Sequence, residues 1–291
     1  MIDLDTRKEI IKLFTEEKIS IKRLSKMYHF NQGTISDMLK SSGIKVVTHE
    51  LKINENKFDE IDTKEKAYWL GFLYADGTIS SQSPDKRSRF EVKLTLKYSD
   101  KSHLKKFNSF MEYKGINLKP VSQNTTLGIK WAISNKHLWT SLNSLGCVPR
   151  KSLILRFPDI NIFKIKDFVY DFIRGYCDGD GCISYSIYND KVSPQISMVG
   201  TENFLSGIQK TLNNIGHLYK KDSYYNYSIG SRKEIETYFS LTYNNPEIYL
   251  DRKYNRARFF MSGKNSADEW RELLKTEKEL EKSILIQYPK I

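Results

Sequence analysis

The sequence has few of the residues that would mark a secreted, zinc-binding or membrane-spanning protein. Its three cysteines, Cys147, Cys177 and Cys182, show no C-x-x-C spacing, so neither a disulfide framework nor a zinc site is indicated. The five histidines are scattered and form no metal-ligand cluster. No apolar run approaches the roughly 18 residues of a membrane span, and the opening MIDLDTRKE contains no apolar segment of a secretory signal. We therefore expect reduced thiols in a cytosolic protein.

Acidic residues are also fewer than basic residues. The 291 residues include 47 lysines and arginines against 35 aspartates and glutamates, a formal net charge of +12. An excess of this size favours a polyanionic partner, most often a nucleic acid. The alternative is a basic surface on an ordinary enzyme. The length allows two or more domains, and the hydrophobic content of 39% indicates a globular fold.

Residues 1–45 carry the pattern of three short helices. Thr6 and Glu9 form a capping-box pattern before the first helix, and Ser20 begins the second. A tight turn precedes the third, QGTISDMLKSSG, so the unit is predicted to be a helix-turn-helix. The third helix of such a motif enters the major groove of DNA. The residues that it would present are Gln32, Thr34 and Ser36 at base edges and Lys40 near a phosphate. A small helical bundle without a DNA role is the alternative.

The rest of the chain contains an internal duplication. Residues 46–62 are polar and weakly patterned, and we interpret them as a linker. Residues 63–164 and 165–265 then each predict the order αββαββα. Residues 266–291 predict an amphipathic helix that Ser266 caps. The fold class that follows is α+β, preceded by a small all-α domain.

Two similar segments end in Asp-Gly, WLGFLYADG (69–77) and IRGYCDGDG (173–181). Small residues recur at helical spacing in these segments and just before the first of them, namely Ala67, Gly71, Ala75, Gly175 and Gly179. A glycine inside a helix costs about 1 kcal/mol relative to alanine, so its presence needs a reason. Small residues four apart let two helix backbones approach closely. If these two helices pack together, their C-terminal ends lie side by side.

That packing would bring Asp76 and Asp180 to one point. Two adjacent carboxylates repel each other and call for a cation between them. Oxygen ligands suit Mg²⁺, and acids that hold a divalent metal near a phosphate are a layout for phosphodiester hydrolysis. The alternative, that each Asp only starts a turn before Gly, is hard to reconcile with two copies that each end a helix rich in small residues.

Each segment resembles the signature of the LAGLIDADG homing endonucleases, and the duplication resembles their single-chain, two-repeat form, over about residues 63–263. The N-terminal unit resembles an appended DNA-binding module of some relatives. The resemblance implies a pseudo-twofold saddle of antiparallel sheets. It also implies a monomeric, site-specific endonuclease that cuts both strands of DNA across the minor groove and leaves a staggered break.

The resemblance further implies Mg²⁺ or another divalent cation such as Mn²⁺ as cofactor, with Ca²⁺ able to bind without supporting cleavage. The expected partner is double-stranded DNA with a long asymmetric target, with no membrane and no obligate protein partner. We expect a free-standing or intron-encoded enzyme in the cytoplasm or nucleoid of a prokaryotic or phage-infected cell, or in an organelle. A non-catalytic DNA-binding transcriptional regulator and an intron RNA maturase of the same fold remain alternatives.

The resemblance assigns roles residue by residue. Asp76 and Asp180 would bind the metal, together with the carbonyl groups of Ala75 and Gly179. Lys151 and Lys253 would lie near the scissile phosphates. Asp100 would orient water in the first repeat, where the second repeat has Thr201. Tyr74 departs from the family pattern, because the motif commonly has an acid there and the second copy keeps it as Asp178.

One face of each sheet would contact DNA, since two-stranded ribbons fit the major groove. The first repeat offers Thr78, Ser80, Gln82, Arg89, Glu91, Lys93, Thr95, Lys97, Lys130 and Ser134 for this face. The second offers Ser184, Ser186, Tyr188, Gln195 and Ser197.

Overall fold

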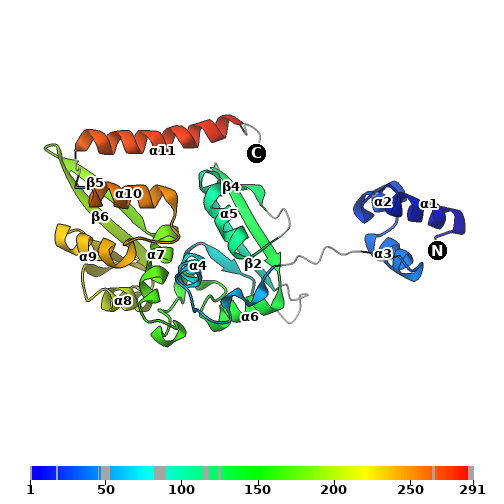
Figure 1. Ribbon diagram of the computed structural model, residues 1–291, viewed down its shortest axis with the longest axis horizontal. Helices are drawn as coiled ribbons and strands as arrows, with labels where there is room; N and C mark the ends of the chain where they lie inside the picture. The colour runs from blue at the N-terminus through cyan, green and yellow to red at the C-terminus, as the bar shows by residue number, and fades with distance from the viewer. Residues whose placement is uncertain are drawn as a thin grey trace. The chain divides into compact units, whose positions relative to one another are not determined.

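The computed structural model describes residues 2–17, 19–44, 46, 53–81, 90–113, 118–123, 126–263 and 266–287 (Figure 1). The chain divides into two compact units, 1–51 and 52–291, which are described separately below. Within the described ranges, each helix is too short or too polar to cross a membrane. The predicted DNA contacts Gln82 and Arg89, and part of the predicted linker, lie outside the described residues.

The N-terminal unit contains the three predicted helices, α1 (Leu4–Thr15), α2 (Ile21–Met27) and α3 (Gln32–Ser41). Its core is formed by Ile10, Leu24, Ile35, Met38 and Leu39, with at least one residue from each helix. On α3, Gln32, Thr34 and Lys40 are exposed and Ser36 is half-buried. Helix α3 therefore has an open polar face.

One of the two predicted caps in this unit is wrong. Asp3, and not Thr6, caps α1, because its carboxylate accepts hydrogen bonds from the backbone N–H groups of Asp5 (3.1 Å) and Thr6 (2.9 Å). Helix α1 therefore begins at Leu4, earlier than predicted, because the carboxylate of Asp3 already accepts from free N–H groups of the first turn. The predicted cap Ser20 is confirmed, as its hydroxyl accepts from the N–H of Arg23 at 3.3 Å.

The second unit has the predicted α+β architecture of two αββαββα repeats. The first repeat comprises α4 (Lys64–Ala75), β1 (Gly77–Ile79), β2 (Glu91–Lys97), α5 (Lys101–Phe110), β3 (Lys119–Gln123), β4 (Thr126–Ser134) and α6 (Lys136–Ser144). The second comprises α7 (Phe168–Asp180), β5 (Cys182–Tyr188), β6 (Lys191–Gly200), α8 (Glu202–Thr211), β7 (His217–Lys221), β8 (Tyr224–Ile229) and α9 (Arg232–Thr242). Each repeat forms an antiparallel four-stranded sheet, in the orders β1-β2-β4-β3 and β5-β6-β8-β7.

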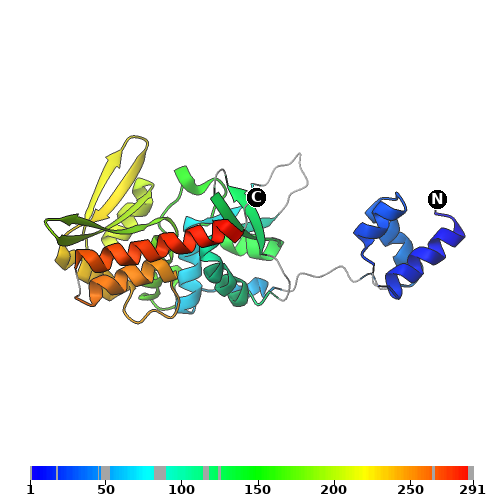
Figure 2. The same ribbon diagram turned by 90° about the horizontal axis from the view of Figure 1, so that it is seen from above.

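Two further helices follow the second repeat. The helix α10 (Asp251–Met261) was not predicted, whereas α11 (Ala267–Gln287) was. The hydroxyl of Ser266 accepts from the N–H of Glu269 at 3.2 Å, as a helix cap does. Figure 2 shows α11 running alongside α10, where Arg256 and Glu277 form an ion pair. The predicted amphipathic helix is therefore packed on the body of the protein.

The predicted linker is too long at its C-terminal end. A short 3₁₀ helix, η1 (Glu55–Phe58), lies within it, and the side chains of Phe58 and Ile61 are buried in the main core. The N–H of Lys164 also donates to the carbonyl of Ile61 at 3.0 Å. Two large apolar side chains in an otherwise polar stretch are enough to anchor it, because each gains about 1.5–3 kcal/mol on burial.

Strand β2 follows the predicted alternation. Val92, Leu94 and Leu96 are buried against the helices, while the residues between them point to the opposite face. Strand β6 in the second sheet has the same pattern around Ile196 and Met198. One face of each sheet is therefore apolar and packed, and the other is polar and open.

Candidate active site

The two helices that end in Asp-Gly pack directly against each other at the centre of the second unit (Figure 1). A Cβ atom on Gly71 would lie 2.0 Å from the carbonyl oxygen of Phe172, and one on Gly175 would lie 2.0 Å from that of Tyr68. Both contacts are therefore closer than any side chain allows. The two contacts are reciprocal, since Tyr68 and Phe172 occupy matching positions in the two repeats. The close packing predicted from the small residues is confirmed, and it has pseudo-twofold symmetry.

This packing extends to the C-terminal ends of the two helices. A Cβ on Gly179 would lie 2.3 Å from the Cβ of Ala75 and 3.3 Å from a carboxylate oxygen of Asp76. Asp76 ends α4, and Asp180 is the last residue of α7. Asp76 is half-buried and Asp180 is exposed. The fold thus brings the two predicted acids to adjoining helix ends.

The electrostatics of the two acids reflect this placement. Burial, and then the charge of Asp180, raise the pKa of Asp76 to about 6, although Lys253 and Lys151 oppose the shift. Burial also raises the pKa of Asp180, against the same two lysines. A carboxylate pair whose ionisation is held back by burial and like charge is a site that gains by binding a cation.

Lys151 binds the end of α4 rather than standing free. Its Nζ donates hydrogen bonds to the carbonyl oxygens of Leu73 (2.7 Å) and Gly77. These carbonyls flank Asp76 on both sides in the sequence. Lys151 is half-buried, and burial lowers its pKa. The side chain therefore places a cationic group against carbonyl groups at the C-terminal end of α4, where a positive charge is favourable.

Lys253 makes the equivalent contacts at the end of α7. Its Nζ donates to the carbonyl oxygens of Cys177 (2.6 Å), Gly179 (3.1 Å) and Gly181 (2.6 Å). Only 2% of Lys253 is exposed, and burial lowers its pKa. The carbonyl of Gly179, which we predicted as a metal ligand, is thus already in contact with a cationic group. A carbonyl oxygen has a second lone pair, so the metal role stays a prediction.

Asp178 holds the start of α10 in place. Its carboxylate accepts from the hydroxyl groups of Tyr68 (2.8 Å) and Tyr243 (2.5 Å) and from the N–H of Leu250 (2.8 Å). Asp178 is fully buried, and all three donors come from other elements. In the first repeat, the hydroxyl of Tyr74 donates to the carbonyl of Leu145. The first repeat therefore has the hydroxyl donor of Tyr74 where the second has the carboxylate acceptor of Asp178. Each side chain connects its helix, α4 or α7, to a later segment of the same repeat.

Asp100 lies in an ion pair that the sequence did not suggest. Arg252 lies in the first turn of α10, and its Nε donates a hydrogen bond to the carboxylate of Asp100 at 3.2 Å. Burial raises the pKa of Asp100, and Arg252 opposes that rise. Thr201 instead caps α8, and its hydroxyl accepts from the N–H of Phe204 at 3.2 Å. A water-orienting role for Asp100 stays a prediction, and Arg252 is a site residue that we did not predict.

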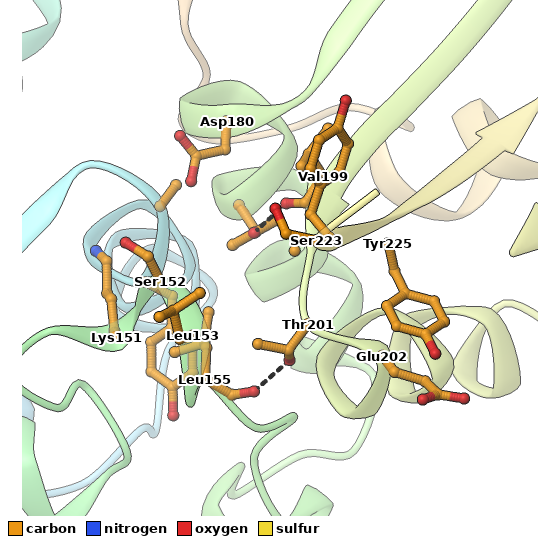
Figure 3. A pocket seen from close by; sticks show the side chains of 15 residues that line it. Lys151, Ser152, Leu153, Leu155, Asp180, Val199, Thr201, Glu202, Ser223 and Tyr225 are labelled. Atoms are coloured by element: carbon orange, nitrogen blue, oxygen red, sulfur yellow. Dashed lines mark hydrogen bonds between the residues drawn. The ribbon is translucent and has the colours of Figure 1, made fainter. Parts of the chain in front are cut away.

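A pocket of about 570 Å³ opens beside Asp180 (Figure 3). Lys151 and Ser152 line one wall, and Thr201 and Glu202 line the opposite wall. Leu153, the next residue after Ser152, also lines the pocket and is 81% exposed. The pocket therefore connects one of the two acids and one of the two lysines with the open face of the second sheet.

Of the residues predicted to contact DNA, those described in the second unit lie on the open faces of the two sheets. Those that are exposed are Thr78, Lys97, Ser134, Ser186, Tyr188 and Gln195; those that are half-buried are Ser80, Glu91, Lys93, Thr95, Lys130, Ser184 and Ser197. The register adds Lys119, His217, Tyr219, Asn226 and Ser228 to the same faces. Alternation within HLYKK and YYNYSI was the signal that could have indicated the last four.

The sequence of the second repeat matches a known protein family. Residues 173–258 match the family model described as LAGLIDADG endonuclease. The second repeat, which carries Asp180 and Lys253, thus has the LAGLIDADG sequence pattern. No curated protein matches the chain.

Solved structures of LAGLIDADG proteins are similar to about three quarters of the chain. The meganuclease I-AabMI bound to uncleaved DNA is 13% identical, with a TM-score of 0.46, and the alignment covers 74% of this chain and 97% of that one. The homing endonuclease I-LtrWI bound to target DNA is 14% identical, with a TM-score of 0.48 and coverage of 78% and 97%. I-SmaMI bound to uncleaveable DNA is 11% identical, with a TM-score of 0.47 and coverage of 76% and 99%.

Proposed function

We propose that this protein is a monomeric, divalent-metal-dependent endonuclease that cuts both strands of double-stranded DNA at a specific site. One observation carries the proposal. Asp76 and Asp180 occupy adjoining C-terminal ends of two tightly packed helices, and each helix end is bound by a lysine. The LAGLIDADG pattern over residues 173–258 supports the same conclusion. The net charge of +12 suits a polyanionic substrate.

The acids suit Mg²⁺ or Mn²⁺, which prefer carboxylate, carbonyl, water and phosphate oxygens. In the described part of the chain, no group of three or more His, Cys, Asp or Glu side chains could hold a metal. We therefore infer that Asp76 and Asp180 hold the cation together with backbone carbonyls such as that of Ala75, with waters and phosphate oxygens filling the remaining positions. When bound there, a divalent cation would neutralise the carboxylate and phosphate charges and would lower the pKa of a water molecule.

The two lysines have unequal capacity to act on a phosphate. A lysine ammonium group has three N–H donors. Lys253 directs all three at backbone carbonyls, whereas Lys151 has two such acceptors among the described residues. Lys151 also lines the pocket beside Asp180. We infer that Lys151 is the lysine that stabilises negative charge on the reacting phosphate, and that Lys253 positions the end of α7.

The open faces of the two sheets would bind the duplex on either side of the acids. The cut would then fall across the minor groove and leave a staggered break. The helix-turn-helix unit would add contacts outside this central region through the exposed residues of α3. Because both repeats belong to one chain, no second copy is required.

The test uses the acids separately. Asp76→Asn and Asp180→Asn should each abolish cleavage of a target selected from a DNA library in Mg²⁺, while the affinity for that target in Ca²⁺ persists. Asp222→Asn changes an exposed turn residue in the same way and should cut like the wild type. Normal cutting by either active-site variant would overturn the assignment of the site.

A further inference from the structure

The open faces of the two sheets carry different chemistry at matching positions. In the first sheet, Thr95 pairs with Lys130, and Lys130 pairs in turn with Lys119. The matching row of the second sheet is formed by Val199, Asn226 and Tyr219. One row therefore carries two positive charges, and its counterpart carries none.

The adjacent row repeats this difference. Lys93 lies between Thr78 and Ala132 in the first sheet. Its counterpart Ser197 lies between Cys182 and Ser228 in the second. Lys221, which shares this face of the second sheet, lies at the end of β7 next to the β7–β8 turn.

The lysine pair of the first sheet is an unfavourable arrangement in the free protein. Lys119 and Lys130 are directly opposite each other on neighbouring strands, and like charges in that position are destabilising. Neither has an ion-pair partner within the described ranges. The matching pair in the second sheet is instead joined by a hydrogen bond, in which the side-chain amide of Asn226 donates to the Tyr219 hydroxyl at 2.5 Å. A polyanion laid across the first sheet would remove the repulsion.

The other lysines of this face can exchange their partners for phosphate. Lys93 pairs with Glu91 at 2.8 Å, and Lys97 pairs with Glu281 at 3.3 Å. The side chains are 38% and 29% exposed in the first pair and 61% and 47% exposed in the second, so solvent reaches both pairs and each contributes little to stability. All four lysines of the first sheet are therefore available to an anionic strand.

We propose that the two sheets bind the two halves of the DNA target through different kinds of interaction. The first sheet binds through charge, by contacts between its lysines and DNA phosphates, and supplies most of the salt-dependent affinity. The second sheet binds through uncharged groups such as Gln195, Asn226 and Ser197, which hydrogen-bond to base edges, and it supplies most of the discrimination between base pairs. This inference rests on the proposed function.

The experiment measures the affinity of the full chain for a selected target in Ca²⁺ as a function of salt concentration. The double variant Lys119→Met/Lys130→Met should lower the magnitude of the slope of log K against log [salt] by about 1–2, since each lost phosphate contact removes about 0.9. Its melting temperature should not fall. Lys105→Met, which alters an exposed lysine on α5, is the matched control and should leave the slope unchanged.

The complementary variant is Asn226→Ala. It should keep the wild-type slope but reduce discrimination at one base pair, where a mismatch ordinarily costs roughly 5- to 150-fold in affinity. The inference is overturned if the lysine variant keeps the wild-type slope, or if Asn226→Ala lowers the slope as much. Failure of the wild-type protein to bind any DNA in the library would instead overturn the proposed function.

Discussion

The contact between α4 and α7 yields the sharpest prediction, the effect of Gly175→Ala. The new Cβ would lie 2.0 Å from the carbonyl oxygen of Tyr68 and 2.9 Å from the N–H nitrogen of Phe72. Ordinary contact begins near 3.4 Å. Both atoms belong to the backbone, so no side-chain rotation relieves the clash. The helices must therefore separate by more than about 1 Å.

The loss of folding stability expected for Gly175→Ala follows from the packing of the core. Overpacking costs about 1–3 kcal/mol, and a backbone clash belongs at the upper end of that range. Alanine returns up to about 1 kcal/mol through its higher helix propensity. The net loss is therefore about 2 kcal/mol. In a unit of this size it corresponds to a fall of roughly 4–8 °C in melting temperature.

The effect on activity should be larger than the effect on stability. Separating the helices also separates Asp76 from Asp180, and a displacement of about 1 Å at reacting groups can cost about 100-fold in rate. Calorimetry and single-turnover cleavage of a selected target measure the two effects. Gly230→Ala is the matched control, since a Cβ there meets no atom within 4 Å, and it should leave both quantities unchanged.

The double variant with Gly71→Ala tests the cause. Gly71 faces Phe172 in the reciprocal contact, so the first substitution already opens part of the space that the second needs. The two losses of stability should therefore sum to more than the loss in the double variant. A melting temperature and cleavage rate equal to those of the wild type in Gly175→Ala would refute the reasoning.

Two further predictions concern charged groups at the site. Lys253→Met should lower the melting temperature more than Lys151→Met, because it removes three hydrogen bonds to backbone carbonyls rather than two, at about 1 kcal/mol each. Lys151→Met should instead slow single-turnover cleavage more than its smaller loss of stability explains. The reverse ranking of melting temperatures would contradict this. The raised pKa of Asp76, about 6 against 3.8, means that the folded metal-free protein holds this proton more tightly than the unfolded chain. The associated stability is present below pH 4 and is lost as the pH rises to 6, by up to about 3 kcal/mol. Asp76→Asn without metal should therefore match the wild type near pH 4 and melt at a higher temperature at pH 7, and equal melting temperatures at pH 7 would show that the shift is absent.

Local patterns in the sequence were sufficient for the architecture and for the two acids. Apolar periodicity predicted both αββαββα repeats, because each element buries one face at a characteristic spacing. The helix α10 was missed, since its first turn is anchored by Asp178, a residue more than seventy positions earlier in the chain. Small residues at helical spacing in the two Asp-Gly segments predicted that α4 and α7 pack against each other, because two helix backbones approach closely only where the side chains between them are small.

What the sequence by itself determined is therefore the order of the elements, the faces that they bury and the pairing of Asp76 with Asp180. Only the tertiary structure decided that Lys253 directs every donor at a backbone carbonyl, that Asp100 meets Arg252, and that Lys119 lies opposite Lys130. Each of these depends on the register and hydrogen-bond geometry between segments far apart in the chain. Local periodicity contains no information about such contacts, because it reports which side of an element is buried and not what the element meets.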